Sequence, residues 1–199
     1  MPELDNICGF YMFGSYLWNS QDKDSDLDYI IVIKEGNNYE QINENNKDFH
    51  IFSKDFYKEE VQRCNEMALS AFIQQEPFIK CNIDTEFKDL DLSVLRNSFS
   101  SKASNSYVKA KKKYQQQDIK LGYKSMYHSI RILILGKEIA KSIKKNKNLV
   151  NAVYSYPLGP IKKLFLNEDW DEINSITKPI FNRYASEFRE VAPKPPKKG

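Results

Sequence analysis

The sequence has few cysteines and no long apolar run. Its three cysteines, Cys8, Cys64 and Cys81, are odd in number and far apart in a chain of 199 residues. This spacing matches neither a disulfide framework nor a set of zinc ligands, so we expect reduced, buried thiols. No stretch approaches the roughly 18 consecutive apolar residues of a membrane span, and the N-terminus lacks the regions of a signal peptide. These absences predict a cytoplasmic protein with no membrane partner and leave its oligomeric state open.

Each half of the chain lacks charge of one sign. Residues 1–98 contain 9 Lys/Arg and 19 Asp/Glu, whereas residues 99–199 contain 21 and 8. Within 102–147 there are 13 basic and 2 acidic residues. A solvated helix surface usually mixes both signs. The one-sided segment therefore points to a polyanion or polyphosphate partner, with an ordinary solvated surface as the alternative.

The acidic half alternates short apolar runs with polar turns. Residues 7–13 and 27–33 are continuous apolar runs that predict buried strands, and 48–53 predicts a third strand after an Asn-rich loop. Residues 55–75 repeat apolar side chains at helical spacing and predict one helix or two. The helical pattern stops near Pro77, after which a further strand is expected.

The basic half is helical throughout. A helix capped by Ser104 or Ser106 is expected to run to about 116, followed by the longest helix pattern at 119–144 and two shorter helices near 160–167 and 170–190. The chain is thus predicted to be α+β, with a first domain at 1–98, a basic helical domain at 99–191 and a disordered tail at 192–199.

The chemistry is carried by a short segment, Phe13-Gly14-Ser15, followed after ten residues by Asp26-Leu27-Asp28-Tyr29. Strand periodicity places Asp26 and Asp28 on one face of an otherwise apolar strand. Two neighbouring carboxylates repel unless a cation lies between them, and such ligands suit Mg²⁺. Gly14 permits close backbone approach to a phosphate. Asp48 begins the next strand and completes a candidate three-carboxylate site.

This pattern resembles the signature of DNA polymerase beta-like nucleotidyltransferases: a hydrophobic-Gly-Ser, nine to thirteen residues, then Asp-hydrophobic-Asp-hydrophobic. The reading FGS YLWNSQDKDS DLDY fits it without a gap. More loosely, up to about residue 190, the chain resembles the predicted bacterial and phage nucleotidyltransferases of the RNA repair pathway polymerase-beta family. It departs from them in having almost no chain before the first strand. The resemblance implies a minimal nucleotidyltransferase domain with a small mixed sheet, followed by a helical domain.

The resemblance also implies the reaction. A hydroxyl attacks the α-phosphate of a nucleoside triphosphate (NTP), such as ATP, and pyrophosphate leaves. Two Mg²⁺ ions, replaceable by Mn²⁺, would assist the reaction. By position, Asp26 and Asp28 would bind both metals, and Asp48 would hold the catalytic metal and could receive the proton. The nucleotide's phosphates would be held by Gly14, Ser15 and Ser25.

Two basic groups are further candidates. Spacings of four and three place Lys124, His128 and Arg131 on one helix face, where they would bind triphosphate or acceptor phosphate, although a helix histidine is often purely structural. A lysine run with tyrosines nearby could follow a nucleic-acid backbone or could be a solvated face: Lys109, Lys111, Lys112 and Lys113. His50 shares a strand face with Asp48 and either orients that carboxylate or merely closes the sheet.

We therefore predict an enzyme that transfers a nucleotide to a hydroxyl on RNA, such as a tRNA or a damaged RNA end. One alternative is a different acceptor: a protein, as in antitoxin-like nucleotidyltransferases, or a small molecule such as an aminoglycoside. The other alternative is a nucleotide- or RNA-binding module without turnover. Three clustered carboxylates argue against that module, because their mutual repulsion has no purpose in a protein that binds no metal.

Overall fold

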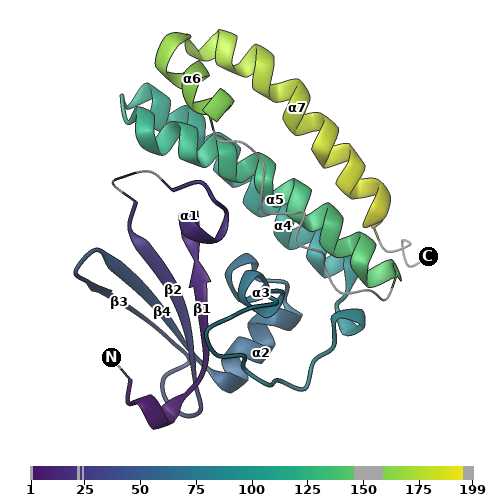
Figure 1. Cartoon of the computed structure of the whole chain (residues 1–199). Helices are drawn as coiled ribbons and strands as arrows, with labels where there is room; N and C mark the ends of the chain where they lie inside the picture. Colours follow the sequence, from purple (N-terminus) through teal and green to yellow (C-terminus); the bar gives the residue numbers. More distant parts are fainter. Residues whose placement is uncertain (1, 22, 24, 146–158, 195–199) are drawn as a thin grey trace. The chain divides into compact units, whose positions relative to one another are not determined.

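A computed structural model describes residues 2–21, 23, 25–145 and 159–194. The chain forms two compact units, residues 1–89 and 90–199 (Figure 1). The predicted boundary at 98/99 lies too late, because it falls within a helix that already begins at Leu92. That helix belongs wholly to the second unit.

The first unit is built on a mixed, four-stranded sheet in the order β1-β2-β4-β3. Its strands are β1 (Ile7–Phe13), β2 (Leu27–Ile33), β3 (Tyr39–Glu44) and β4 (Lys47–Ser53). β1 pairs antiparallel to β2, β2 parallel to β4, and β3 antiparallel to β4. The three apolar runs are strands as predicted. β3, within the expected Asn-rich loop, was missed.

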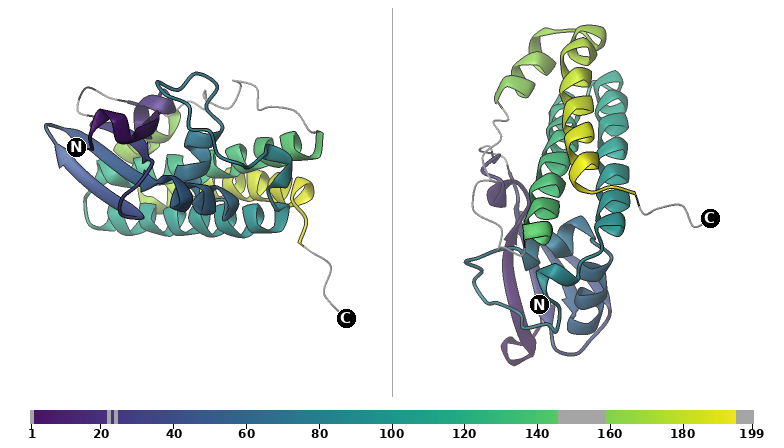
Figure 2. Two further views of the ribbon diagram at one scale, coloured as in Figure 1. Left: turned by 90° about the horizontal axis from the view of Figure 1, so that it is seen from below. Right: turned by 90° about the vertical axis from the view of Figure 1, so that its right-hand side faces the viewer.

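One face of this sheet is covered by helices. α2 (Lys54–Gln62) packs on β2 and β4, and α3 (Glu66–Phe72), capped by the side chain of Asn65, packs on β1. Figure 2 shows both helices on the same side of the sheet. The predicted helical segment 55–75 is thus two helices, which the left-handed backbone of Cys64 separates. This covered part of the face is apolar, with fully buried side chains: Tyr11, Ile30, Val32 and Tyr57.

The opposite face carries its own apolar cluster of Ile31, Ile33, Phe49 and Ile51, bordered by partly buried residues such as Phe10. The outer edge of β1 is met by residues 77–83. The strand predicted there is reduced to one bridge between Phe10 and Ile79.

The same segment brings two cysteines together. Cys8 Sγ and Cys81 Sγ lie 3.5 Å apart as free thiols, although 73 positions separate them in the chain. Cys64 and Cys81 are buried as expected, but Cys8 is only half-buried. The Cys81 amide donates to the Tyr11 hydroxyl at 2.7 Å, and burial raises the pKa of Tyr11 to about 12.

The second unit is helical. It contains α4 (Leu92–Gln115), α5 (Ile119–Lys145), α6 (Gly159–Asn167) and α7 (Trp170–Val191). α5, α6 and α7 match their predicted positions closely. α4 begins twelve or more residues earlier than expected, because its cap is Asp91, whose carboxylate accepts from the Ser93 and Val94 amides. Ser104 and Ser106 lie inside the helix.

Close packing joins the long helices of this unit (Figures 1 and 2). A Cβ at Gly136 of α5 would lie 2.9 Å from a ring atom of Phe188 and 3.0 Å from one of Phe99, so only glycine permits this approach. Lys137 and Glu187 link α5 to α7 at 2.8 Å. No helix among the described residues has the length and apolarity needed to cross a membrane.

The C-terminal end of the fold lies slightly beyond the predicted domain limit. Ala192 is fully buried, and its carbonyl accepts from Arg96 at 3.0 Å, so the predicted tail begins too early. Residues 195–199 of that predicted tail lie outside the described residues.

Candidate active site

The centre of the candidate site is the contact between Gly14 and Asp28. β1 ends at Phe13, which pairs with Asp28, and the chain turns at once into the short helix α1 (Gly14–Leu17). Gly14 has a φ of +63°, and a Cβ there would lie 1.7 Å from Asp28 Oδ2. Glycine is therefore required twice, for the left-handed backbone and for the space that the Asp28 carboxylate occupies. The first half of the predicted motif closes directly on the second.

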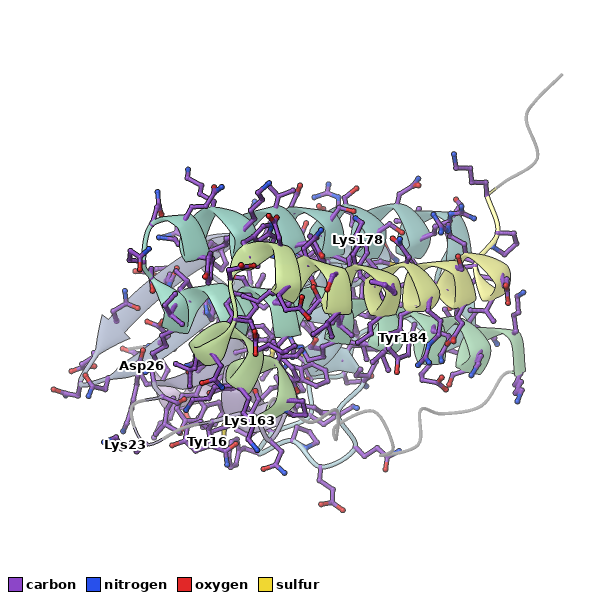
Figure 3. The ribbon with its side chains drawn as sticks, turned by 90° about the horizontal axis from the view of Figure 1, so that it is seen from above. Tyr16, Lys23, Asp26, Lys163, Lys178 and Tyr184 are labelled. Atoms are coloured by element: carbon purple, nitrogen blue, oxygen red, sulfur yellow. The ribbon has the colours of Figure 1, made fainter. Side chains whose placement is uncertain are left out.

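Asp48 stands beside Asp28 on the neighbouring strand. The two residues are register partners in the parallel pairing of β2 with β4, so their side chains leave the same face of the sheet. Both are half-buried. Asp26 precedes β2 and is exposed, and Figure 3 shows it with Lys23 and Tyr16 at the surface of this unit.

This donor set fits a hard divalent cation in its chemistry. Asp28 and Asp48 provide paired carboxylates at the ends of two adjacent strands, and Asp26 supplies a third carboxylate two residues before Asp28. The side chains are not gathered into a ready-made cage: within the described ranges, no three His, Cys, Asp or Glu residues lie close enough together to hold a metal. The pair is thus built by the sheet, whereas Asp26 stands outside it.

The remaining residues of the predicted phosphate site flank this pair. Ser15 is half-buried in α1, and its carbonyl accepts from the Ser20 amide at 2.9 Å, which folds the chain back after α1. Ser25 is half-buried and directly precedes Asp26. Gly14, Ser15 and Ser25 therefore surround the start of β2, next to the carboxylates.

The structure adds a residue that sequence reasoning missed. The Tyr39 hydroxyl lies 2.8 Å from His50 Nδ1, and the two rings stack with centroids 6.2 Å apart. The edge of the Phe13 ring meets the same imidazole at 5.9 Å. Burial lowers the pKa of His50, and the neighbouring Asp48 charge opposes that shift in part. His50 is thus a neutral ring, fixed on the face that carries Asp48.

In the helical unit, the predicted basic face on α5 is present. An Arg131 guanidinium nitrogen lies 2.6 Å from His128 Nδ1, in agreement with their spacing of three. Burial, and then the positive charges of Arg131, Lys102 and Lys109, hold the pKa of His128 well below its usual value. His128 is therefore neutral and can accept a hydrogen bond from Arg131. Lys124 lies one turn earlier and is half-buried.

The lysine run on α4 does not form one surface. Lys111 lies over the Trp170 ring, 6.0 Å from its centroid, and Lys113 pairs with Asp118 at 3.5 Å. Lys109 instead contributes to the positive potential at His128, and Lys112 is exposed. The run predicted as a nucleic-acid track therefore divides between two sides of the helix.

Comparison with known proteins assigns the first unit. Residues 2–74 match the family model described as "Nucleotidyltransferase domain". No curated protein sequence matches the chain. Among solved structures, a nucleotidyltransferase-like protein from Exiguobacterium sibiricum 255-15 has 9% identity and a TM-score of 0.35, covering 94% of this chain and 73% of that one. Spectinomycin adenyltransferase AAD(9) from Enterococcus faecialis, solved with ATP and spectinomycin, has 15% identity and a TM-score of 0.40, covering 94% and 93%.

The matched residues include the Gly14-Ser15 turn and all three candidate aspartates. Residues 2–74 therefore form a nucleotidyltransferase domain of the polymerase beta-like superfamily. The protein is accordingly a nucleotidyltransferase enzyme, as the sequence predicted.

Proposed function

We propose that this protein transfers a nucleoside monophosphate from an NTP to a hydroxyl group of RNA, with Mg²⁺ held by Asp26, Asp28 and Asp48. The observation that carries the proposal is the Gly14 contact with Asp28, beside its register partner Asp48. An otherwise unfavourable pair of carboxylates is built into the fold at the point where the backbone leaves room for a phosphate. A bound divalent cation would polarise the reacting phosphate and hydroxyl oxygens.

In this reaction, the acceptor oxygen forms a bond to the α-phosphorus while the bond from that phosphorus to the β-phosphate oxygen breaks. Pyrophosphate leaves, and the hydroxyl proton passes to the Asp48 carboxylate. Gly14 and Ser15 bind the β- and γ-phosphates, and Ser25 supports the same region. Asp26 moves from its exposed position toward Asp28 when the charge between them is neutralised.

The basic helical unit supports RNA as the acceptor. Positively charged residues outnumber acidic ones 13 to 2 between positions 102 and 147, and a nucleic-acid backbone is the polyanion that such a segment suits. Arg131 carries a planar group suited to phosphate, and His128 orients it through their 2.6 Å contact.

The acceptor is tested by labelling. The protein is incubated with each NTP radiolabelled on the α-phosphate, Mg²⁺ or Mn²⁺, and total cellular RNA, protein or spectinomycin. Label in RNA, abolished by EDTA and by Asp28→Asn, is the expected result. The Asp26→Asn variant should fail in the same way, while both variants keep the wild-type melting temperature, since removal of one of two repelling charges relieves strain.

Other outcomes identify the alternatives. The first unit is acidic, which favours a cationic acceptor, so label in spectinomycin alone would assign a small-molecule acceptor. Label in a protein would assign the antitoxin-like chemistry. Undiminished transfer in Asp28→Asn at saturating Mg²⁺ would refute the active site itself.

A further inference from the structure

The edge strand β3 presents an uncovered polar row beside the candidate site. Its pairing with β4 sets Asn43 opposite Asp48, Gln41 opposite His50 and Tyr39 opposite Phe52. Register partners point to the same side of a sheet, so Tyr39, Gln41 and Asn43 share the face that carries the aspartates. All three side chains are exposed, and Tyr39 retains 42% of its surface.

This row differs chemically from the rest of the unit. The unit is strongly acidic, yet the row offers two neutral amides and an aromatic ring. The charged residues of the strand, Glu40 and Glu44, occupy the alternate positions and point to the opposite face. Amides bind hydroxyl and base-edge groups without requiring charge, and an exposed aromatic ring is a stacking surface for a base.

Tyr39 also fixes the imidazole behind it. Its hydroxyl contacts His50 Nδ1 at 2.8 Å, and the rings stack, while Phe13 holds the imidazole from the other side. With Nδ1 engaged, Nε2 is the ring nitrogen left for a ligand, and the described residues offer it no hydrogen-bond partner. His50 lies two residues from Asp48 on the same strand face, so an oxygen bound there would lie next to that carboxylate.

We infer that Tyr39, Gln41 and Asn43, with His50, form the acceptor-binding strip of the enzyme, and that it receives the terminal nucleoside of an RNA. The base stacks on Tyr39, the amides bind the sugar and base edges, and His50 Nε2 positions the attacking hydroxyl beside Asp48. A polycationic acceptor would gain little from this neutral row. The inference rests on the proposed function and specifies where its acceptor binds.

Kinetics with a short RNA as acceptor test the strip. Tyr39→Ala should raise the KM for RNA about tenfold or more, the scale of a lost stacking contact, and leave the KM for the NTP unchanged. Glu40→Ala is the matched control, since it changes the adjacent residue of the same strand on the other face, and it should leave both constants unchanged. Tyr39→Phe retains the ring but not the contact with His50, so it should lower kcat and leave the KM for RNA near the wild-type value.

The outcomes separate the inference from the proposed function. Wild-type protein that labels no RNA would refute both. Wild-type protein that labels RNA, with the same KM for RNA in Tyr39→Ala and Glu40→Ala, would refute the strip alone. Gln41→Ala, which alters an exposed side chain, provides a second test if Tyr39→Ala does not fold, and should raise the KM for RNA severalfold.

Discussion

Replacement of Gly14 by alanine should damage stability and activity together, for two separable reasons. An alanine at a φ of +63° costs about 1–2 kcal/mol in backbone strain. Its Cβ would also lie 1.7 Å from Asp28 Oδ2 and 2.5 Å from Asp28 Cγ, so the carboxylate must leave its position. A shift into a poor rotamer adds about 1 kcal/mol. We expect a loss of about 2–3 kcal/mol in the free energy of unfolding, the sum of these terms.

Activity should fall more steeply than stability. Displacement of a catalytic group by about 1 Å reduces turnover on the order of a hundredfold, and Gly14→Ala displaces Asp28 by at least that much. Gly36→Ala is the control: it has a φ of +150°, and its Cβ would meet only the flexible end of Ile33, at 2.6 Å. It should lose stability and keep full activity.

A double-mutant cycle separates the two reasons. Asp28→Ala removes the atoms at 1.7 and 2.5 Å and leaves only its Cβ, 2.8 Å away. On that background, Gly14→Ala should cost about 1 kcal/mol less than in the wild type, measured by urea unfolding, because residues in contact couple. Strictly additive free energies of unfolding, or wild-type turnover in Gly14→Ala, would refute the proposed geometry.

Further predictions concern the helical unit. Arg131→Ala should weaken triphosphate or acceptor binding by about 1–3 kcal/mol, and Arg131→Lys should restore only part of it, since the fork geometry is lost; unchanged kinetics in both would leave the residue a structural role. Lys112→Glu, which reverses an exposed charge, should flatten the salt dependence of RNA affinity by about 0.7 log units per contact, with NTP binding unchanged. Because the folded state disfavours protonated His128, the unfolded state binds more protons below about pH 6.5. The free energy of unfolding should therefore decrease as pH falls through that value, and His128→Gln should reduce the decrease.

Much of the fold was accessible to sequence reasoning because its strands are nearly continuous apolar runs. β1, β2 and β4 lie in the middle of the sheet or against its apolar clusters, so their burial is written in their composition. β3 is different. Its sequence, YEQINE, is polar on both faces, and five of its six residues are exposed. Only its pairing with β4 makes it a strand, and that pairing is a tertiary effect.

The same distinction applies to the site. Gly14, Asp28 and Asp48 could be grouped from the sequence because each stands at the end of a recognisable strand. The contact of Tyr39 with His50 could not, because it requires β3. The lysine run misled for a related reason: an unbroken sequence run turns 100° per residue around a helix, so Lys109 and Lys111 face different neighbours. The start of α4 was lost because Asp91, rather than a serine in the Ser-rich stretch, is the cap.

The bridge between Phe10 and Ile79 has a consequence for the order in which this protein can fold during its synthesis. The first strand to leave the ribosome has its outer edge completed by a segment made about 70 residues later, where the Cys81 amide also meets the Tyr11 hydroxyl. Until that segment emerges, the backbone groups of the β1 edge remain available to other chains. Such long-range contacts form slowly. The nascent N-terminal unit therefore passes through an open-edged stage, which ends only when translation has gone beyond residue 83.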